Sequence, residues 1–439
     1  MISRDAQIGL LNPARAPARF GWADLRVLLT ALAVACVFGC SSMLLTHIGY
    51  RYGSTGGSPL EKFHPSSIVL SAAFAILLFE RGFSRRAAEL LTRHALTAIY
   101  FACVAYHAAY VALIVGRPVT MVVDTFLAPG MLFLLLCNTN VGAVRRIAGL
   151  IHGILALNAL IGFSESAFKW RLIPYYLNEG AVTYDWRSTA LLGHPLQNAA
   201  ITAIYAFLLL AGSRGGLPRN LVLPAFALQF AALPAFGGRT ATVLLMVLGI
   251  LWLVKEGALI LIGKRFPLNR LLWLCLGLPI LALGLWYLSD STYVTAFLDR
   301  FVEDEGSAET RVMMLGLFSH FSWTELFFGP EAARLDAIAV SAGLEYGIES
   351  FVIAFLLQTG IFAASLIFIA LAAFSLDLAR TLSRPGILAL LVFLALNAST
   401  TGLSSKGTTF TLFVAIAMAL DGAQSGTRLN RRLAETGSA

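Results

Sequence analysis

Three basic residues of this sequence lie beside small residues at the ends of apolar stretches. A positive charge at such a position calls for a specific role. Arg187 lies in YDWRSTALLGHPLQNA, Arg239 in AFGGRTATVLL and Lys406 in NASTTGLSSKGTTF. A guanidinium group binds two phosphate oxygens at once through its planar fork of donors, and an ammonium group acts as a point charge. These residues are therefore candidates for binding a phosphate group. The alternative is that they anchor the ends of membrane helices or pair with carboxylates such as Asp185.

Two further segments carry groups suited to holding a substrate. His194 and Asn198 are four residues apart at the predicted start of a helix, so they share one face and can bind a sugar hydroxyl. The alternative is that they only satisfy the first turn of that helix. Arg311 lies in ETRVMMLGLFSHF, whose apolar residues recur at three- and four-residue steps and predict a short amphipathic helix. It is a candidate to position a substrate, unless it pairs with Glu309.

Two acidic residues complete the set of candidates. Glu349, in GLEYGIESFVIAFLLQTGIF, precedes a long apolar helix, so it is either a general base or a partner of the helix dipole. Asp124 lies inside an apolar stretch, where an ionisable group indicates function by default or pairs with an arginine. The sequence contains no Walker loop, no zinc-type His/Glu spacing and no G-x-S-x-G elbow. We therefore expect neither a metal nor another cofactor.

These candidates are embedded in a sequence that is too apolar for a water-soluble domain. Of its 439 residues 58% are hydrophobic and 13% are charged, and the mean hydropathy is +0.77. Soluble domains usually contain about 25% charged residues. The composition predicts an all-α polytopic integral membrane protein. The net charge of +8 then reflects Lys and Arg residues that orient the helices in the membrane, so we expect no nucleic acid as a partner.

Apolar stretches bounded by polar residues predict about twelve transmembrane helices, for which roughly 20 residues are needed to cross the bilayer. They are expected near residues 26–47, 66–80, 95–116, 119–137, 147–163, 196–212, 221–236, 240–262, 271–289, 347–375, 385–398 and 408–421. The last two are short and are expected to tilt or to pack inside the bundle. With a cytoplasmic N-terminus, about two thirds of the 32 Lys and Arg residues fall in inner segments, as the positive-inside rule requires.

This topology divides the chain into one membrane domain and two tails. Residues 1–25 and 422–439 are the expected cytoplasmic tails, and residues 26–421 form a single transmembrane domain. Its long outer loops are residues 164–195 and 290–346, the second of which comes before the tenth helix. Loops of this length are uncommon unless they are functional or disordered. The candidate residues therefore concentrate on the outer side of the membrane.

Four segments of the chain together resemble one family of membrane proteins. They are RSTALLGHPLQNA, GGRTATVLLMVLGI, ETRVMMLGLFSHFSWTELFFGP and ESFVIAFLLQTGIF. The first three resemble, in the O-antigen polymerase and O-antigen ligase superfamily, an arginine before a G-H-P-x-x-N-A helix start, a small-residue turn with arginine, and an outer-loop arginine helix. The fourth resembles the ligases' pattern of H-[N/S/Q], nine residues, then Gly, but Glu349 stands where the ligases carry histidine. This departure favours a polymerase, and the chain is most similar to exopolysaccharide polymerases of the VpsF type.

The resemblance implies a metal-independent membrane glycosyltransferase in the bacterial inner membrane, with its active face toward the periplasm. Its expected partners are undecaprenyl-diphosphate-linked glycans and membrane lipid, with other polysaccharide-assembly proteins as further candidates. Arg187 and Arg239 would hold the diphosphate, and Glu349 would take the proton of the acceptor hydroxyl. The expected substrate-binding residues are His194, Asn198, Arg311, Lys406 and Asp124. Competing interpretations are an O-antigen-type ligase, a transporter or flippase of lipid-linked intermediates, and a non-catalytic scaffold.

Overall fold

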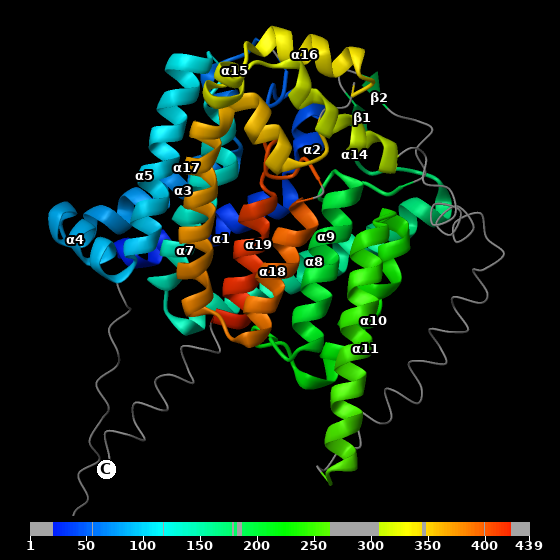
Figure 1. Ribbon diagram of the computed structural model, residues 1–439. Coiled ribbons are helices and arrows are strands. Elements are labelled where there is room, and N and C mark those ends of the chain that lie inside the picture. Colours follow the sequence, from blue (N-terminus) through cyan, green and yellow to red (C-terminus); the bar gives the residue numbers. More distant parts are fainter. Residues whose placement is uncertain are drawn as a thin grey trace, which may run out of the picture.

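Long apolar segments form most of the helices, because a helix satisfies its own backbone hydrogen bonds and can be surrounded by lipid. The computed structural model describes residues 21–54, 56–116, 118–177, 180–181, 187–263, 307–344, 348–398 and 400–422. Seven described helices are long and apolar enough to cross a membrane, and a bent pair makes an eighth candidate (Figure 1). The prediction of an all-α, membrane-embedded protein is thus confirmed for the described part of the chain.

Helices account for nearly all regular structure in the first half of the chain. The helices are α1 (Trp22–Gly39), α2 (Ser42–His47), η1 (Pro59–Lys62), α3 (Pro65–Phe79), α4 (Phe83–Arg93), α5 (Ala95–Tyr110), η2 (Val111–Val115), α6 (Thr120–Val122), η3 (Val123–Leu127), α7 (Ala128–Cys137) and α8 (Val141–Phe168). A short antiparallel hairpin follows α8, in which β1 (Tyr176–Leu177) pairs with β2 (Gly180–Ala181).

The second half of the chain is helical throughout its described residues. The helices are α9 (Pro195–Leu210), α10 (Arg219–Phe236), α11 (Arg239–Leu261), α14 (Ser307–Gly316), η4 (Leu317–His320), α15 (Trp323–Phe328), α16 (Ala332–Ser341), α17 (Phe351–Thr381), α18 (Arg384–Ala398), α19 (Thr409–Ala417) and η5 (Met418–Gly422).

Most of the predicted spans coincide with helices, and the differences lie at helix ends and at breaks inside two predicted spans. The predicted helix 26–47 is broken after Gly39, and Ser41 caps a separate short helix, α2, by accepting a hydrogen bond from the backbone of Leu44. Helix α8 continues to Phe168, so the first turn of the predicted outer loop 164–195 is helical. Predicted helix 271–289, residues 264–306, which include part of the loop 290–346, and most of both predicted tails lie outside the described residues.

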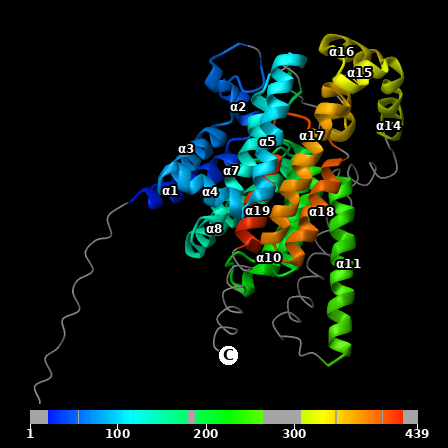
Figure 2. The same ribbon diagram turned by 60° about the vertical axis from the view of Figure 1, so that its left-hand side comes forward.

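Two clusters of buried apolar side chains hold the helices together. The larger lies among the long helices and contains stacked aromatic rings such as Phe393 and Phe413, whose centroids are 4.3 Å apart. The smaller lies under α14–α16 and includes Met314, Leu335 and, from α17, Leu357. Figure 2 shows α14, α15 and α16 grouped at one end of the molecule. Following the predicted topology, we call this the outer end and the opposite one the inner end.

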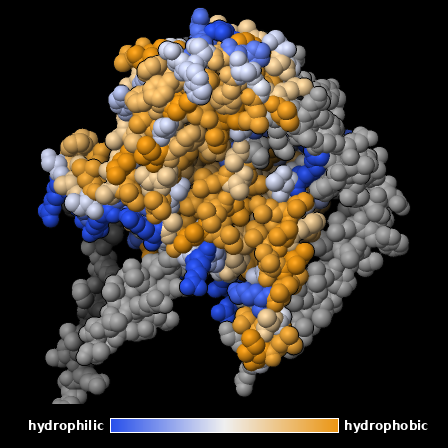
Figure 3. Space-filling view, viewed as in Figure 1, coloured by the Kyte–Doolittle hydropathy of each residue, from blue (hydrophilic) through white to orange (hydrophobic). Residues whose placement is uncertain are grey.

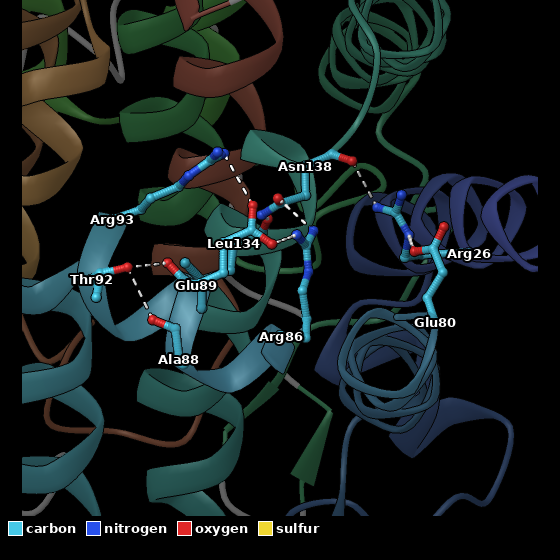
Figure 4. A network of polar contacts seen from close by, with 9 residues as sticks. All are labelled: Arg26, Glu80, Arg86, Ala88, Glu89, Thr92, Arg93, Leu134 and Asn138. Atoms are coloured by element: carbon cyan, nitrogen blue, oxygen red, sulfur yellow. Dashed lines mark hydrogen bonds and ion pairs between the residues drawn. The ribbon is translucent and has the colours of Figure 1, made fainter. Parts of the chain in front are cut away.

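A network of ion pairs joins several helices at the inner end (Figure 4). The guanidinium group of Arg26, at the start of α1, lies 3.2 Å from the carboxylate of Glu80, just after α3. Arg86 of α4 pairs with Glu89 and donates a hydrogen bond of 2.6 Å to the side chain of Asn138, which follows α7. The arginines therefore bind carboxylates and carbonyl groups between helices. The face of the molecule shown in Figure 3 is broadly apolar, with hydrophilic residues toward its edges.

Helix α17 is broken at Gly360, where it meets the outer helices. Gly360 has φ 79° and ψ 161°, a conformation that is essentially restricted to glycine. A Cβ atom on Gly360 would overlap the backbone of Gly329, and one on Gly329 would lie 3.0 Å from the carbonyl carbon of Thr359. The two backbones are thus in direct contact, which fixes the end of α15 against the break in α17.

Candidate functional site

The segment that carries Arg187 is bound directly to the outer end of α10. The backbone nitrogen of Ser188 donates a hydrogen bond of 2.8 Å to the carbonyl oxygen of Ala235. Helix α10 ends one residue later, and Gly237 then adopts a left-handed conformation with φ 67°. This turn makes Arg239 the first residue of α11. Two of the predicted phosphate-binding arginines therefore lie on segments that contact each other.

A glycine lets the start of α11 pack closely on α9. A Cβ atom on Gly238 would overlap the side chain of Ala199, in the second turn of α9. Helix α9 begins after His194, so the N-termini of α9 and α11 lie side by side. The N-terminus of a helix carries unpaired N–H groups and the positive end of the helix dipole. We call the region formed by these two helix N-termini, Arg187 and Arg239 the arginine corner. Its donors and positive charges make it suited to binding an anion.

A buried carboxylate shapes the loop around Arg187. Glu165, in the last turn of α8, is 3% exposed. Its Oε2 atom accepts hydrogen bonds from the hydroxyl of Ser188 at 2.5 Å and from the backbone nitrogens of Thr189 and Ala190 at 3.0 and 2.9 Å. Its Oε1 atom accepts one from the backbone nitrogen of Leu172 at 2.8 Å. All four donors belong to the loop between α8 and α9. This carboxylate therefore connects the beginning of the loop to its end.

The sequence pattern does not single out Glu165, because the residue falls just beyond the predicted span. One signal could have identified it. A carboxylate in the last turn of a helix is disfavoured by the helix dipole, so an acid at that position needs a compensating set of donors. The segment GFSESAF contains such an acid at the end of an apolar run.

Asn198 belongs to the framework of the same loop. Its side chain is fully buried, and Nδ2 donates to the carbonyl oxygens of Thr189 at 2.7 Å and His194 at 3.1 Å. Its Oδ1 accepts a hydrogen bond of 2.9 Å from Asn158, whose own Oδ1 accepts one from the backbone of Leu191. These contacts occupy both ends of the amide, so the structure places Asn198 behind the loop.

His194 and a further arginine lie beside an aromatic ring at this corner. The imidazole of His194 meets the ring of Tyr175 edge-on, with centroids 5.7 Å apart. The guanidinium carbon of Arg171 lies 6.0 Å from the centroid of the same ring, and its Nη2 donates a hydrogen bond of 3.3 Å to the carbonyl oxygen of Arg187. Arg171 lies in the predicted outer loop 164–195, and these contacts add it to the candidate site.

Asp124 and Lys406 come together in a separate buried cluster. The two carboxylate oxygens of Asp124 each lie 3.2 Å from the backbone nitrogen of His64. The Nζ atom of Lys406 donates to the carbonyl oxygens of Tyr52 at 2.8 Å and Lys62 at 2.5 Å, and lies 3.9 Å from the centroid of the Tyr52 ring. The buried Tyr52 hydroxyl lies close to Asp124 but outside hydrogen-bonding geometry.

The residue after Asp124 holds the turn that carries Lys406. The hydroxyl of Thr125 donates to the carbonyl oxygen of Ser405 at 3.1 Å and accepts from the backbone nitrogen of Gly407 at 3.2 Å. Burial lowers the pKa of Lys406 from 10.5 to about 8. These contacts connect three outer segments. The arrangement of Asp124 and Lys406 is therefore one that holds these segments together.

Arg311 and Glu349 belong to the outer helices. Arg311 is part of α14, which packs through Met314 into the smaller apolar cluster. Glu349 is exposed and follows Ile348, which is buried in that cluster. It lies directly before Ser350, the N-cap residue of α17, where a carboxylate is stabilised by the helix dipole. The two residues therefore share a support that is distinct from the arginine corner.

Among the described residues, no group of three His, Cys, Asp or Glu side chains could hold a metal ion. Comparison with protein-family models and with curated proteins found no match to this sequence.

Proposed function

We propose that this protein polymerises oligosaccharide repeats linked to undecaprenyl diphosphate, on the periplasmic face of a bacterial inner membrane. The observation that carries the proposal is the corner formed by Arg187, Arg239 and the adjoining N-termini of α9 and α11. Their shared chemistry is the recognition of a strongly charged anion next to an apolar surface. A polyprenyl diphosphate combines these two properties in one molecule.

Arg239 is the first residue of α11, next to the positive end of the helix dipole, and this position bears on the proposal. A cation in the first turn of a helix is repelled by the positive end of the helix dipole. A bound diphosphate would reverse this penalty, because it would interact favourably with the guanidinium group and with the helix end. Arg187 would bind the same anion from the adjacent loop, and Arg171 would support it through the Arg187 carbonyl group.

The reaction would transfer the growing glycan from one lipid to another. The bond between the anomeric carbon of the donor glycan and its diphosphate breaks, and a bond from that carbon to an acceptor hydroxyl oxygen forms. The hydroxyl proton passes to Glu349, and undecaprenyl diphosphate leaves with the bonding electrons. Arg187 and Arg239 stabilise the charge that develops on the leaving group. His194 and Arg311 position the two glycans, and the activated donor makes a nucleotide unnecessary.

The topology that we propose has twelve transmembrane helices and both tails in the cytoplasm. Its support is the gathering of Arg26, Arg86 and Arg93 at the inner end, where the positive-inside rule expects them. The arginine corner lies at the outer end, where lipid-linked repeats would be displayed. In this topology the chemistry would take place on the periplasmic side.

The buried cluster around Asp124 weighs against a transporter. A transporter needs polar groups along a path through the bundle, whereas the neighbours of Asp124 are groups of outer segments, His64 among them. A ligase would use the same diphosphate recognition and differ only in its acceptor. A scaffold without activity would tolerate the loss of any single arginine.

The test is incubation of the purified protein in nanodiscs with lipid-linked repeat units, followed by sizing of the glycan. We expect chains of several repeats from the unchanged protein, and none from Arg239→Ala or Glu349→Gln variants that insert normally. Arg334→Ala is the matched control, because this arginine pairs with Glu325 on the outer helices. Single repeats only from the unchanged protein, or normal chains from both variants, would refute the proposal.

A further inference from the structure

Helix α15 is attached to α5 at a level where α5 is still apolar. The hydroxyl of Tyr110 donates a hydrogen bond of 2.6 Å to the carbonyl oxygen of Phe328, the last residue of α15. Beyond Tyr110 the chain continues outward as η2 to Val115. In this extension Leu113 is 81% exposed and Ile114 is 67% exposed. Apolar side chains thus extend outward past the point where α15 is attached.

The contact with α17 indicates the same depth. The unbroken part of α17 runs from Ile361 to Thr381. At 1.5 Å per residue this part is about 30 Å long, which matches the hydrocarbon thickness of a bilayer. Gly329, directly after α15, lies against the break at Gly360. Helix α15 therefore lies at the outer boundary of the segment that would cross the membrane, rather than above it.

Exposed aromatic side chains cluster at this level. Trp323, Phe327 and Phe328 of α15 are 81%, 45% and 51% exposed, and Tyr106 of α5 and Phe362 of α17 are 55% and 37% exposed. We call these five residues the outer aromatic patch. Phe327 lies 6.3 Å from Phe362 and 5.0 Å from Phe328, and Phe362 lies 6.4 Å from Tyr106, measured between ring centroids. Trp323 and Phe327 are four residues apart and so share one side of α15.

Other residues of α15 are polar or packed on protein. Leu326 is buried in the smaller apolar cluster. Glu325 accepts hydrogen bonds from the backbone and hydroxyl of Ser322 at 2.8 and 2.7 Å and pairs with Arg334. A short helix with aromatic residues on one side and charged residues on the other is suited to the interface between headgroups and acyl chains.

We propose that the outer aromatic patch inserts into the boundary between headgroups and acyl chains of the outer leaflet. The occupant of this surface is membrane lipid, and the insertion holds α14–α16 at the membrane surface. Because Glu349 and Arg311 belong to the same unit, the anchor would also set their height above the bilayer. This membrane anchoring does not require the transferase activity.

The test measures the depth of Trp323 in the full chain. The protein is reconstituted into nanodiscs whose lipids carry bromine either just below the headgroup or near the end of the acyl chain. Tryptophan fluorescence is measured, and the contribution of Trp323 is the difference in emission between the unchanged protein and the Trp323→Phe variant. Trp323→Phe is a conservative change at an exposed site. Trp22→Phe, a second exposed tryptophan at the start of α1, is the matched control for the subtraction.

We expect the Trp323 contribution to lose most of its intensity with shallow bromines, less with deep bromines, and little with iodide in the water. Quenching by iodide without quenching by bromine would place α15 in the aqueous phase and overturn the proposal. Quenching by neither would mean that protein covers the patch, which would also overturn it.

Discussion

The carboxylate of Glu165 lies 2.9 Å from the backbone nitrogen of Ala190, at the turn that follows Arg187. Ala190 has a positive φ of 37°, a region that costs a residue with a Cβ atom roughly 1–2 kcal/mol. The loop is thus held in an unfavourable conformation by a charged acceptor. A glycine would adopt this conformation without strain. At Ala190 the hydrogen bond to the Glu165 carboxylate stabilises the conformation instead.

Glu165→Gln should loosen the arginine corner. The change replaces one oxygen by an amide group that would face N–H donors, and leaving buried donors unpaired costs about 1–3 kcal/mol each. We expect a lower unfolding temperature and a higher KM for the lipid-linked donor. If Glu165 acts by placing Arg187, the double variant with Arg187→Ala should have the same KM as Arg187→Ala alone.

Asp421→Asn is the control for this experiment, because Asp421 also accepts hydrogen bonds from loops, namely from Ser213 and Ser383 at the inner end. It should lower the unfolding temperature without changing KM. A Glu165→Gln variant that is less stable but binds the donor normally would limit Glu165 to a structural role. Full activity of Arg187→Ala would instead contradict the proposed diphosphate site itself.

Gly360→Ala should be strongly destabilising. A Cβ atom would overlap the backbone of Gly329, and the conformation of Gly360 is essentially available only to glycine. We expect a loss of about 3 kcal/mol or more in the free energy of unfolding, seen as a lower midpoint in thermal unfolding. Gly249→Ala in α11, where nothing lies within 4 Å of the added atom, should be neutral or stabilising by up to about 1 kcal/mol. Equal effects of the two changes would contradict this contact.

The contribution of Lys406 to stability should increase with pH. Its pKa is about 8 in the folded protein, against 10.5 for the free side chain, because burial disfavours the charged ammonium. Between these two values the unfolded chain binds more protons than the folded protein, so the free energy of unfolding rises with pH. Below about pH 8 both states are protonated, and this gain is lost.

Thermal unfolding of the unchanged protein and of Lys406→Met between about pH 7 and pH 10 measures this effect. We expect the difference between their midpoints to grow in favour of the unchanged protein above about pH 8. A difference that stays constant or shrinks with pH would mean that Lys406 remains charged in the folded state.

Arg187→Lys and Arg239→Lys should each raise the KM for the lipid-linked donor. Lysine keeps the positive charge but loses the planar fork that binds two phosphate oxygens. We expect a rise of about tenfold, which corresponds to ~1.4 kcal/mol, and a larger rise for the alanine variants. Arg334→Lys should leave KM unchanged, because its partner is Glu325. Equal KM values for the lysine and unchanged proteins would argue against bidentate binding.

The positions of most helices follow from apolar runs, because lipid forces each such run to form a helix. The apolar pattern does not reveal the break at Gly360, since LLQTGIF reads as a continuous apolar segment and the break depends on Gly329, far away in sequence. It also places Glu165 in a loop, because a single acid at the end of a run reads as the beginning of polar sequence. The spacing of residues in the sequence does not show that the donors to Glu165 lie close to it.

Tertiary contacts also separate the candidate residues into those of the arginine corner and those bound to the backbone of the chain itself. The residue types at Arg187 and Arg239 are sufficient to suggest anion binding, and the hydrogen bond from Ser188 to Ala235 shows that their segments meet. Asp124 and Lys406 also look suited to a substrate, but their partners are the backbones of His64, Tyr52 and Lys62. Whether a charged group faces a ligand or its own chain depends on tertiary contacts.

The ion pair between Arg26 and Glu80 has a consequence for how the protein is made. While α1 emerges from the ribosome, Arg26 is a free positive charge that favours the cytoplasmic side. Once α3 is in place, the arginine is buried, 6% exposed, against the carboxylate at the end of that helix. Inverting the first hairpin afterwards would require breaking this pair and moving its charges across the bilayer. Under the proposed topology, Arg26 would thus first orient α1 and then, once paired with Glu80, help to retain that orientation in the finished structure.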